Sequence, residues 1–334
     1  MATTRILTYP PPLDDKAVGK SSRNILIFFI SGNPGLIGYY EPFLSTLRAR
    51  IDETASLRHI RFHIYGQDLA GFRDDDHEPF TARRKPYDLE YQIRHNLATI
   101  ERLRVESGSR TGLPYDEVLL IGHSVGAYIA LELFRRQLRS RDSAPYLNLA
   151  SGLLLFPTIE HIAKSPNGWK LDLLRRIPLL SDNVHYILRA FLHLCPRRAV
   201  YWVVRRILGF PPSSAEVTTR WLKSRDGVWQ TLHMGLDEMR TIGEDRWDEE
   251  LWEIAHNADA LDRSPPKFFF FFGKHDQWVA SHYRDQFIRR RQNQVERTRL
   301  IVDEGDIPHA FCIHHNETVA EKAIAWIAEM YSAT

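Results

Sequence analysis

A serine in the pentapeptide GHSVG (122–126) matches the pattern Gly-x-Ser-x-Gly. An apolar run at 117–121 precedes it and an amphipathic pattern at 125–138 follows it, so the serine is expected at a sharp turn from strand to helix. Glycines at both ends of the pentapeptide allow such a turn. Partial positive charge near a helix N-terminus favours a developing anion there. The pattern predicts that Ser124 is a nucleophile; the alternative is a serine that only caps the helix.

A serine nucleophile needs a base, usually histidine, and an acid that orients the base. In a fold with this kind of turn both groups follow the serine, the acid first and the histidine last. Asp276 comes shortly after the apolar run 267–272, and His309 comes after the run 298–302. Because the carboxyl ends of parallel strands meet at one edge of a sheet, these two side chains are expected beside Ser124.

Other acidic and imidazole groups compete for the same two roles. Spacing alone does not select among 15 histidines, but the position of His309 after the last apolar run favours it. We therefore predict Ser124, Asp276 and His309 as catalytic residues. The competing acids are Glu160, Asp303 and Asp306, and the competing bases are His275, His314 and His315.

The stretch SGNPG (31–35) follows an earlier apolar run. Attack of a serine on a carbonyl group produces an oxyanion, which needs backbone N–H donors. One donor is expected from Val125, the residue after the nucleophile, and a second from a loop such as SGNPG. Pro34 has no N–H, which leaves Asn33 as the best second donor and Gly35 as the next. We predict that Asn33 acts through its backbone, so replacing its side chain should reduce activity less than distorting the turn. The alternative is a tight turn without a donor role.

The elements that must position these residues are visible as apolar runs and amphipathic patterns. Most of the apolar runs lack the alternation of a half-exposed strand, which favours a mostly parallel sheet covered on both faces. Strands that alternate with helices predict a doubly wound α/β fold. The predicted strands are 24–30, 60–65, 117–121, 149–156, 267–272 and 298–302, and the main predicted helices are 40–50, 89–104, 125–138 and 316–330.

The alternation of strands and helices stops between Thr158 and about Arg263. This span contains prolines, tryptophans and short helical patterns, but no convincing strand. It is typical of a helical insertion between two strands of the sheet. We therefore predict a first core part at 1–157, a helical cap or membrane-contact insertion at 158–263, and a second core part at 264–334.

Two segments of the insertion are strongly apolar and carry arginine as their only charged residue. In VHYILRAFLHLC (184–195) the polar residues recur every four positions, so they form one stripe on a helix. AVYWVVRRILGF (199–210) repeats the pattern. Such helices suit an anionic lipid surface. The alternative is a cap that lines an acyl pocket, and one segment could do both, but a buried cap would leave the arginines in need of partners. The predicted contact residues are Arg189, Arg197, Arg198, Trp202, Arg205 and Arg206.

The composition is that of an ordinary globular protein. The chain has 334 residues, 43% of them hydrophobic, and a formal net charge of +2, which gives no argument for a nucleic-acid partner. Its two cysteines imply no disulfide framework. The N-terminal stretch lacks the apolar core of a signal peptide, and no apolar run approaches the ~20 residues of a transmembrane helix. We expect a cytosolic protein, or one attached to a membrane from the cytosolic side, of unknown oligomeric state.

These features together resemble the α/β-hydrolase superfamily. IYGQDLAGF (64–72) looks like the Asp-Leu-Pro-Gly-Phe turn of that superfamily, with Ala70 in place of proline, and Ser31-Gly32 replaces its usual His-Gly pair. Three segments look more narrowly like the lipid-droplet-associated hydrolase family, and the match spans essentially the whole chain. These segments are SGNPGLIGYYEPF (31–43), LLIGHSVGAYIALE (119–132) and GKHDQWV (273–279).

The resemblance implies a serine hydrolase of lipid droplets and the endoplasmic reticulum, with Ser124, Asp276 and His309 as its triad. Implied substrates are sterol esters, triacylglycerols or short-chain esters. No cofactor or metal is needed, and the implied partners are a neutral-lipid ester and the surface of a lipid droplet or of the endoplasmic reticulum. Two alternatives stay open. The same triad could transfer the acyl group to an alcohol, or the protein could be mainly a non-catalytic droplet-surface factor that affects lipid storage.

Overall fold

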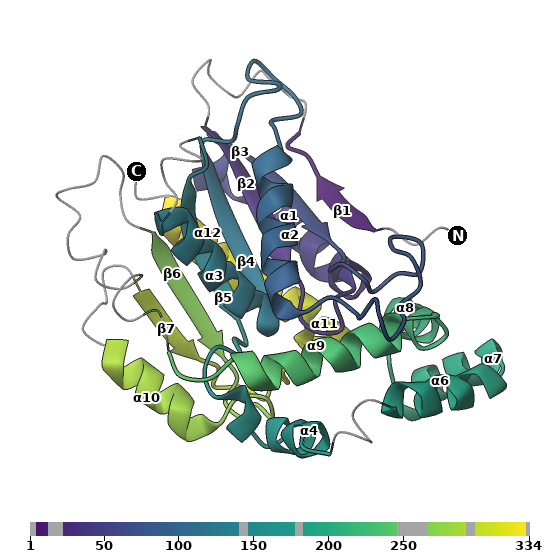
Figure 1. The fold of residues 1–334 in the computed structure, drawn as a ribbon. Coiled ribbons are helices and arrows are strands. Elements are labelled where there is room, and N and C mark those ends of the chain that lie inside the picture. Colours follow the sequence, from purple (N-terminus) through teal and green to yellow (C-terminus); the bar gives the residue numbers. More distant parts are fainter. Residues whose placement is uncertain are drawn as a thin grey trace.

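The computed structural model describes residues 5–12, 23–139, 146–177, 183–245, 247, 251, 266–291 and 298–331. A seven-stranded sheet has the order β1-β3-β2-β4-β5-β6-β7, and its pairs are parallel except for β1 with β3 (Figure 1). The strands are β1 (Ile6–Tyr9), β2 (Arg23–Ile30), β3 (Ile60–Gln67), β4 (Glu117–His123), β5 (Leu149–Leu155), β6 (Lys267–Phe272) and β7 (Thr298–Val302).

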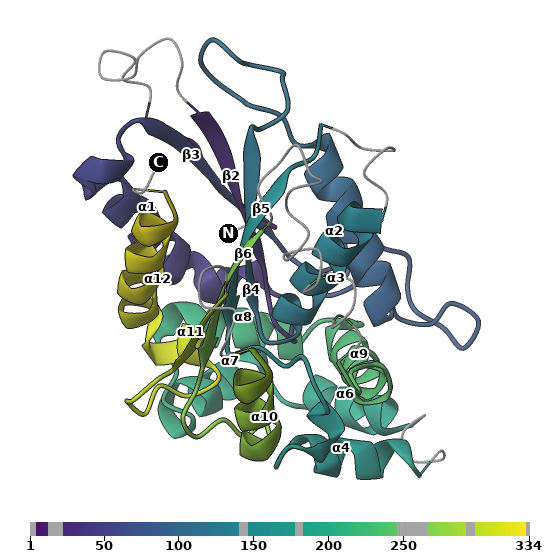
Figure 2. The ribbon, with the colours of Figure 1, turned by 90° about the vertical axis from the view of Figure 1, so that its left-hand side faces the viewer.

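Helices cover both faces of this sheet (Figure 2). On one face α1 (Glu41–Glu53) packs with α12 (Asn316–Tyr331), and on the other α2 (Leu89–Arg102) packs with α3 (Val125–Arg139). The predicted doubly wound α/β fold is confirmed, as is each predicted strand. The antiparallel edge strand β1 was not predicted. Shorter elements complete this part: η2 (Ile37–Tyr40), η3 (Ala55–Leu57), α10 (Ser281–Arg291) and α11 (Phe311–His314).

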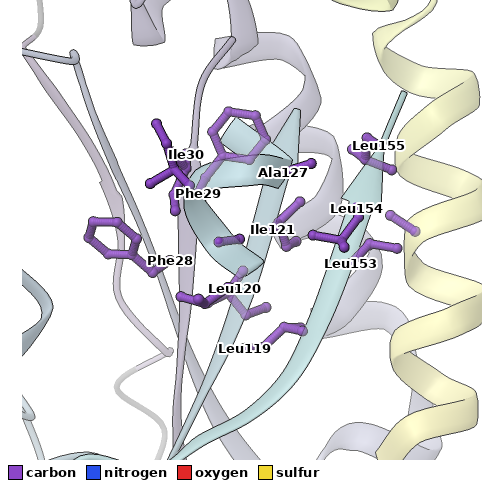
Figure 3. Packing of buried hydrophobic residues seen from close by; sticks show 14 of the residues in the cluster. Phe28, Phe29, Ile30, Leu119, Leu120, Ile121, Ala127, Leu153, Leu154 and Leu155 are labelled. Atoms are coloured by element: carbon purple, nitrogen blue, oxygen red, sulfur yellow. The ribbon is translucent and has the colours of Figure 1, made fainter. Parts of the chain in front are cut away.

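The centre of the sheet is held by continuous apolar runs. Every residue of β2 after Arg23 is buried, and so is every residue of β4 after Glu117. Helix α3 is buried from Val125 to Phe134, because it packs against the sheet over its whole first part. Figure 3 shows Phe28 and Phe29 of β2 in the same cluster as Leu120 of β4 and residues of β5. This packing fixes the carboxyl ends of the strands, where the predicted site residues lie.

The described residues between the end of β5 and the start of β6 form helices and no strand. These helices gather beyond the carboxyl ends of the strands (Figures 1 and 2), and α9 packs against α4, α6 and α8. The predicted boundaries of the insertion stay a prediction, and position 263 lies outside the described residues. The helices are η4 (Ile162–Lys164), α4 (Gly168–Arg175), α6 (Val184–Leu194), α7 (Arg197–Trp202), the π-helical turn η5 (Val203–Ile207), α8 (Pro212–Leu222) and α9 (Gly227–Thr241).

Candidate active site

Ser124 lies at the turn between β4 and α3 with a φ of 56°, in the left-handed region that non-glycine residues rarely occupy. The flanking glycines make this turn possible. A Cβ atom on Gly122 would lie 2.4 Å from the carbonyl oxygen of Gly126, and a Cβ on Gly126 would lie 2.3 Å from that of Ile30. Because any side chain at either position would collide with backbone, the sequence Gly-x-Ser-x-Gly is required for α3 to start this close to the sheet.

The structure brings His309 and Asp276 together with Ser124. His309 Nδ1 lies 2.7 Å from Asp276 Oδ2, and His309 Nε2 lies 2.9 Å from Ser124 Oγ. A carboxylate only accepts hydrogen bonds, so Nδ1 carries the hydrogen and Nε2 is left to accept the serine proton. The backbone N–H of Trp278 donates to Asp276 Oδ1 at 2.7 Å, which fixes the carboxylate. The Asp276 side chain is almost fully buried and that of His309 is 14% exposed, so the base is reachable and its orienting acid is not.

The groups that competed for these roles lie elsewhere. Glu160 pairs with Arg290, and burial raises its pKa to about 7. Asp303 pairs with Lys322 at 3.5 Å. The imidazole that is hydrogen-bonded to Ser124 Oγ is that of His309. Of the remaining competitors, Asp306, His275 and His314 are exposed, and His315 follows α11.

His123, the residue before the serine, contributes an arrangement that the sequence did not predict. Its Nε2 donates to the backbone oxygen of His309 at 2.9 Å, and its Nδ1 accepts from Tyr40 Oη at 2.7 Å. Burial lowers the pKa of His123 well below its ordinary range, so the ring is neutral and these donor roles are fixed. Tyr40 Oη in turn accepts from the N–H of Gly32 at 3.2 Å. One chain of hydrogen bonds therefore joins the SGNPG loop to the backbone of His309.

The SGNPG loop lies against the serine, as its predicted role requires. A Cβ on Gly32 would be 3.0 Å from Ser124 Cβ, so the loop touches the nucleophile's own side chain. The Asn33–Pro34 peptide bond is cis. Gly35 accepts from the N–H of Leu69 at 2.8 Å, which ties the loop to the segment after β3. The oxyanion role of the backbone N–H groups of Asn33 and Val125 stays a prediction.

The Asn33 side chain makes contacts that the sequence analysis missed. Its Nδ2 donates to the backbone oxygen of Thr231 at 3.1 Å and to Glu238 Oε1 at 3.0 Å, both on α9. Glu238 is buried, and burial raises its pKa to about 8. The charge of Asp237 adds to that rise, whereas the hydrogen bond from Asn33 opposes it. Nothing in the sequence pattern connects Asn33 with positions 198 and 205 residues away.

Helix α6 turns His185 and Arg189, the first two residues of its polar stripe, to the protein and most of its apolar side chains to solvent, whereas the third polar residue, His193, is exposed. His185 is buried and stacks on Trp229 of α9, with ring centroids 4.1 Å apart, and Arg189 is half-buried beside it. On the other side Phe191 is 64% exposed and Leu194 is 84% exposed. This is the reverse of an ordinary surface helix. Further exposed apolar side chains of α6, α7 and η5 are Tyr186, Ile187, Leu188, Trp202, Val203 and Ile207.

The predicted membrane-contact residues lie on and beside this exposed apolar surface. Trp202 is 57% exposed, and Arg197, Arg198 and Arg206 are exposed as well. Arg197 pairs with Glu216, and Arg205 donates to the Phe210 backbone oxygen at 3.1 Å. None of the helices that the structure describes is long and apolar enough to cross a membrane. Over the same described ranges, no group of three or more His, Cys, Asp or Glu side chains is arranged to hold a metal ion.

The model of the lipid-droplet associated hydrolase family matches residues 23–312. The chain belongs to this family. Among family members, the lipid droplet-associated hydrolase of Drosophila melanogaster is 29% identical over 88% of this chain and 86% of its own length. The human lipid droplet-associated hydrolase is 26% identical over 96% of this chain and 90% of its own. The family assignment makes the chain a hydrolase, and the names of its relatives associate them with lipid droplets.

Solved structures of other proteins share the fold of this chain. A reconstructed ancestral haloalkane dehalogenase aligns over 97% of this chain and 95% of its own, with a TM-score of 0.58 and 17% identity. A peroxisomal α/β-hydrolase from Saccharomyces cerevisiae aligns over 98% of this chain and 82% of its own, with a TM-score of 0.59 and 13% identity. At this identity the likeness establishes the fold alone, which is the α/β-hydrolase fold expected from the sequence.

Proposed function

We propose that this chain is a serine esterase that hydrolyses carboxylic esters of neutral lipids, such as sterol esters, triacylglycerols or short-chain esters. The observation that carries the proposal is the hydrogen-bonded series Ser124 Oγ, His309 and Asp276, with separations of 2.9 and 2.7 Å. An imidazole held by a buried carboxylate and bonded to a serine hydroxyl is an arrangement for acyl transfer. The family assignment, which makes the chain a hydrolase, supports the same reading.

The proposed reaction has two halves. Ser124 Oγ attacks the ester carbonyl while His309 Nε2 takes the hydroxyl proton, and the backbone N–H groups of Asn33 and Val125 hold the oxyanion. Collapse of the tetrahedral intermediate expels the alkoxide, which leaves as the alcohol with the proton from His309. Water, activated by the same histidine, then hydrolyses the acyl-enzyme. Asp276 stabilises the imidazolium in both halves and stays ionised.

The proposed site of action is the cytosolic face of a lipid droplet or of the endoplasmic reticulum. The orientation of α6 supports this site of action. Its large apolar side chains, which a buried cap would cover, face solvent. Contact with an oil phase removes such side chains from water, which is favourable by about 25 cal/mol per Å² of apolar surface. The exposed arginines beside them suit the phosphate groups of the surface lipids.

Labelling and turnover experiments test the proposal. Wild-type protein should react with a fluorophosphonate at Ser124, and Ser124→Ala should not. The same pair should be compared on p-nitrophenyl butyrate, emulsified triacylglycerol and a sterol ester, with a lipid alcohol added in a parallel series. Ester cleavage that survives in Ser124→Ala would refute the serine mechanism. Formation of a new ester from the added alcohol would identify acyl transfer in place of hydrolysis.

A further inference from the structure

The side chain of Asn33 spans the gap between the loop beside Ser124 and a helix of the insertion. Its Nδ2 group donates to two acceptors at once, the Thr231 carbonyl oxygen at 3.1 Å and Glu238 Oε1 at 3.0 Å. A primary amide has two N–H bonds, so both are used. Asn33 Oδ1 is buried and lacks a hydrogen-bond partner among the described residues. The orientation of the amide is therefore set by its donors, which point at α9.

One side of α9 lets the Asn33 side chain lie close to the helix. Thr231 and Glu238 are seven residues apart, which is about two helical turns, so they lie on one side of α9. Gly235 lies between them on the same side. A Cβ at Gly235 would be 3.5 Å from Asn33 Nδ2 and 3.1 Å from Leu171 Cδ2 of α4. A glycine at this position therefore lets α9 lie close to both α4 and the loop.

We infer that the side chains of Asn33 and Glu238 have a positioning role, because their hydrogen bond holds the SGNPG loop in place from the insertion. This inference rests on the proposed function, in which the Asn33 backbone N–H is an oxyanion donor. The donor and the tethered amide belong to one residue, so a change at Glu238 displaces the donor without touching the substrate. It also gives the Asn33 side chain a part in activity, whereas the sequence suggested a role for its backbone alone.

The hydrogen bond between Asn33 and Glu238 can be tested separately from the other contacts by which α9 packs on the core. Gln230 of α9 also bonds the core: its Oε1 accepts from the Tyr87 N–H at 2.9 Å and its Nε2 donates to the Tyr87 carbonyl oxygen at 2.7 Å. Gln230 is fully buried, as Glu238 nearly is, yet its partner lies in the segment before α2 and not beside Ser124. Gln230→Ala is therefore a matched control that weakens the docking of α9 without releasing the loop.

The experiment compares wild type, Asn33→Ala, Glu238→Ala, Glu238→Gln and Gln230→Ala on a soluble short-chain ester, with kcat, KM and the thermal midpoint measured for each. Asn33→Ala and Glu238→Ala should lower kcat about 10-fold with little change in KM, well short of the ~10²–10³-fold loss on removing an oxyanion donor. Glu238→Gln keeps an oxygen acceptor and should stay close to wild type. Gln230→Ala should lose thermal stability and retain kcat.

Wild-type kcat in Asn33→Ala, or an equal loss of kcat in Gln230→Ala, would overturn the inference. Hydrogen exchange gives a readout that does not depend on turnover. Amide exchange in residues 31–38 should rise in Asn33→Ala and Glu238→Ala, and not in Glu238→Gln or Gln230→Ala. An inactive wild type with this exchange pattern would refute the proposed function while leaving the tether intact. Unchanged exchange with an active wild type would refute the tether alone.

Discussion

His123 Nε2 donates to the backbone carbonyl oxygen of His309 at a distance of 2.9 Å. The residue beside the proposed nucleophile thus holds the main chain of the proposed base, while the base's own ring holds Ser124 Oγ. The series of hydrogen bonds continues through Tyr40 Oη to the Gly32 N–H. Both sides of the reaction centre therefore share one fixed set of donors. Because His123 is fully buried and neutral, this set does not change over the usual pH range.

Tyr40→Phe should destabilise the protein and slow turnover. Removing the hydroxyl leaves the Gly32 N–H and His123 Nδ1 buried without a partner, and each unsatisfied group costs about 1–3 kcal/mol. Urea unfolding should show that loss. The loss of kcat should exceed that of Tyr39→Phe, a buried neighbour whose hydroxyl bonds Thr218 of α8 at 2.8 Å. Equal kcat values in the two variants would show that the hydrogen bonds through Tyr40 and His123 do not support His309.

Asp276→Asn should lower kcat by about 10³–10⁴-fold with little change in fold. An amide in place of the carboxylate can donate to His309 Nδ1 and so favours the tautomer that cannot accept the serine proton. Glu160→Gln is the control, because Glu160 also follows a strand of the sheet but pairs with Arg290. A larger loss in Glu160→Gln than in Asp276→Asn would reassign the acid.

The sequence allows prediction of those candidate site residues whose positions depend on the ends of strands. Ser124, Asp276 and His309 each follow an apolar run, and parallel strands bring such positions to one edge whatever the intervening chain does. The SGNPG loop was selected for the same reason, by its place after β2, and Asn33 within it because Pro34 has no N–H. The Asn33 partners Thr231 and Glu238 were not predictable, because they depend on how α9 packs beyond the carboxyl ends of the strands. No local pattern encodes that packing.

The sequence did not predict the orientation of α6 either. The periodicity of VHYILRAFLHLC identifies a helix with a narrow polar stripe, but not which side faces the protein. The structure shows that His185 stacks on Trp229, a contact between residues of two different helices. Only this packing reveals that the apolar side is the exposed one. The edge strand β1 was missed because four residues are too few for a periodicity signal.

The contribution of Glu238 to the stability of the wild type should fall as pH rises from about 5 to 8, and Glu238→Gln should remove that contribution. Burial raises the pKa of Glu238 from its ordinary 4.5 to about 8 in the folded protein. Between these values the unfolded chain has released the proton and the folded chain still holds it, so rising pH favours unfolding. Thermal midpoints measured at intervals from pH 5 to 9 test this. Parallel curves for the two proteins would contradict the assignment.

Replacing two exposed apolar residues of α6 should release the protein from lipid surfaces. Phe191→Ser with Leu194→Ser removes the two most exposed large side chains of the helix, at 64% and 84%. Fully burying one such side chain is worth about 1.5–3 kcal/mol, so binding should weaken at least ~10-fold. Flotation with triolein droplets coated with anionic phospholipid measures this.

The control for the droplet experiment is Leu113→Ser, which alters a 49% exposed leucine remote from the insertion in sequence. It should float like the wild type. The double variant should also keep its kcat on a soluble short-chain ester, because α6 carries none of the reacting groups. Undiminished flotation of the double variant would exclude α6 as the contact surface.

Helix α9 has α6 packed along it and Asn33 bonded to its side. A helix of 15 residues is stiff over its whole length, so it cannot shift at one of these contacts without moving the other. On the proposal that α6 rests on a lipid surface, a force applied to α6 by that surface would be felt beside Ser124. The insertion would then act as a lever, and the tension and composition of the droplet surface would be variables of the proposed turnover.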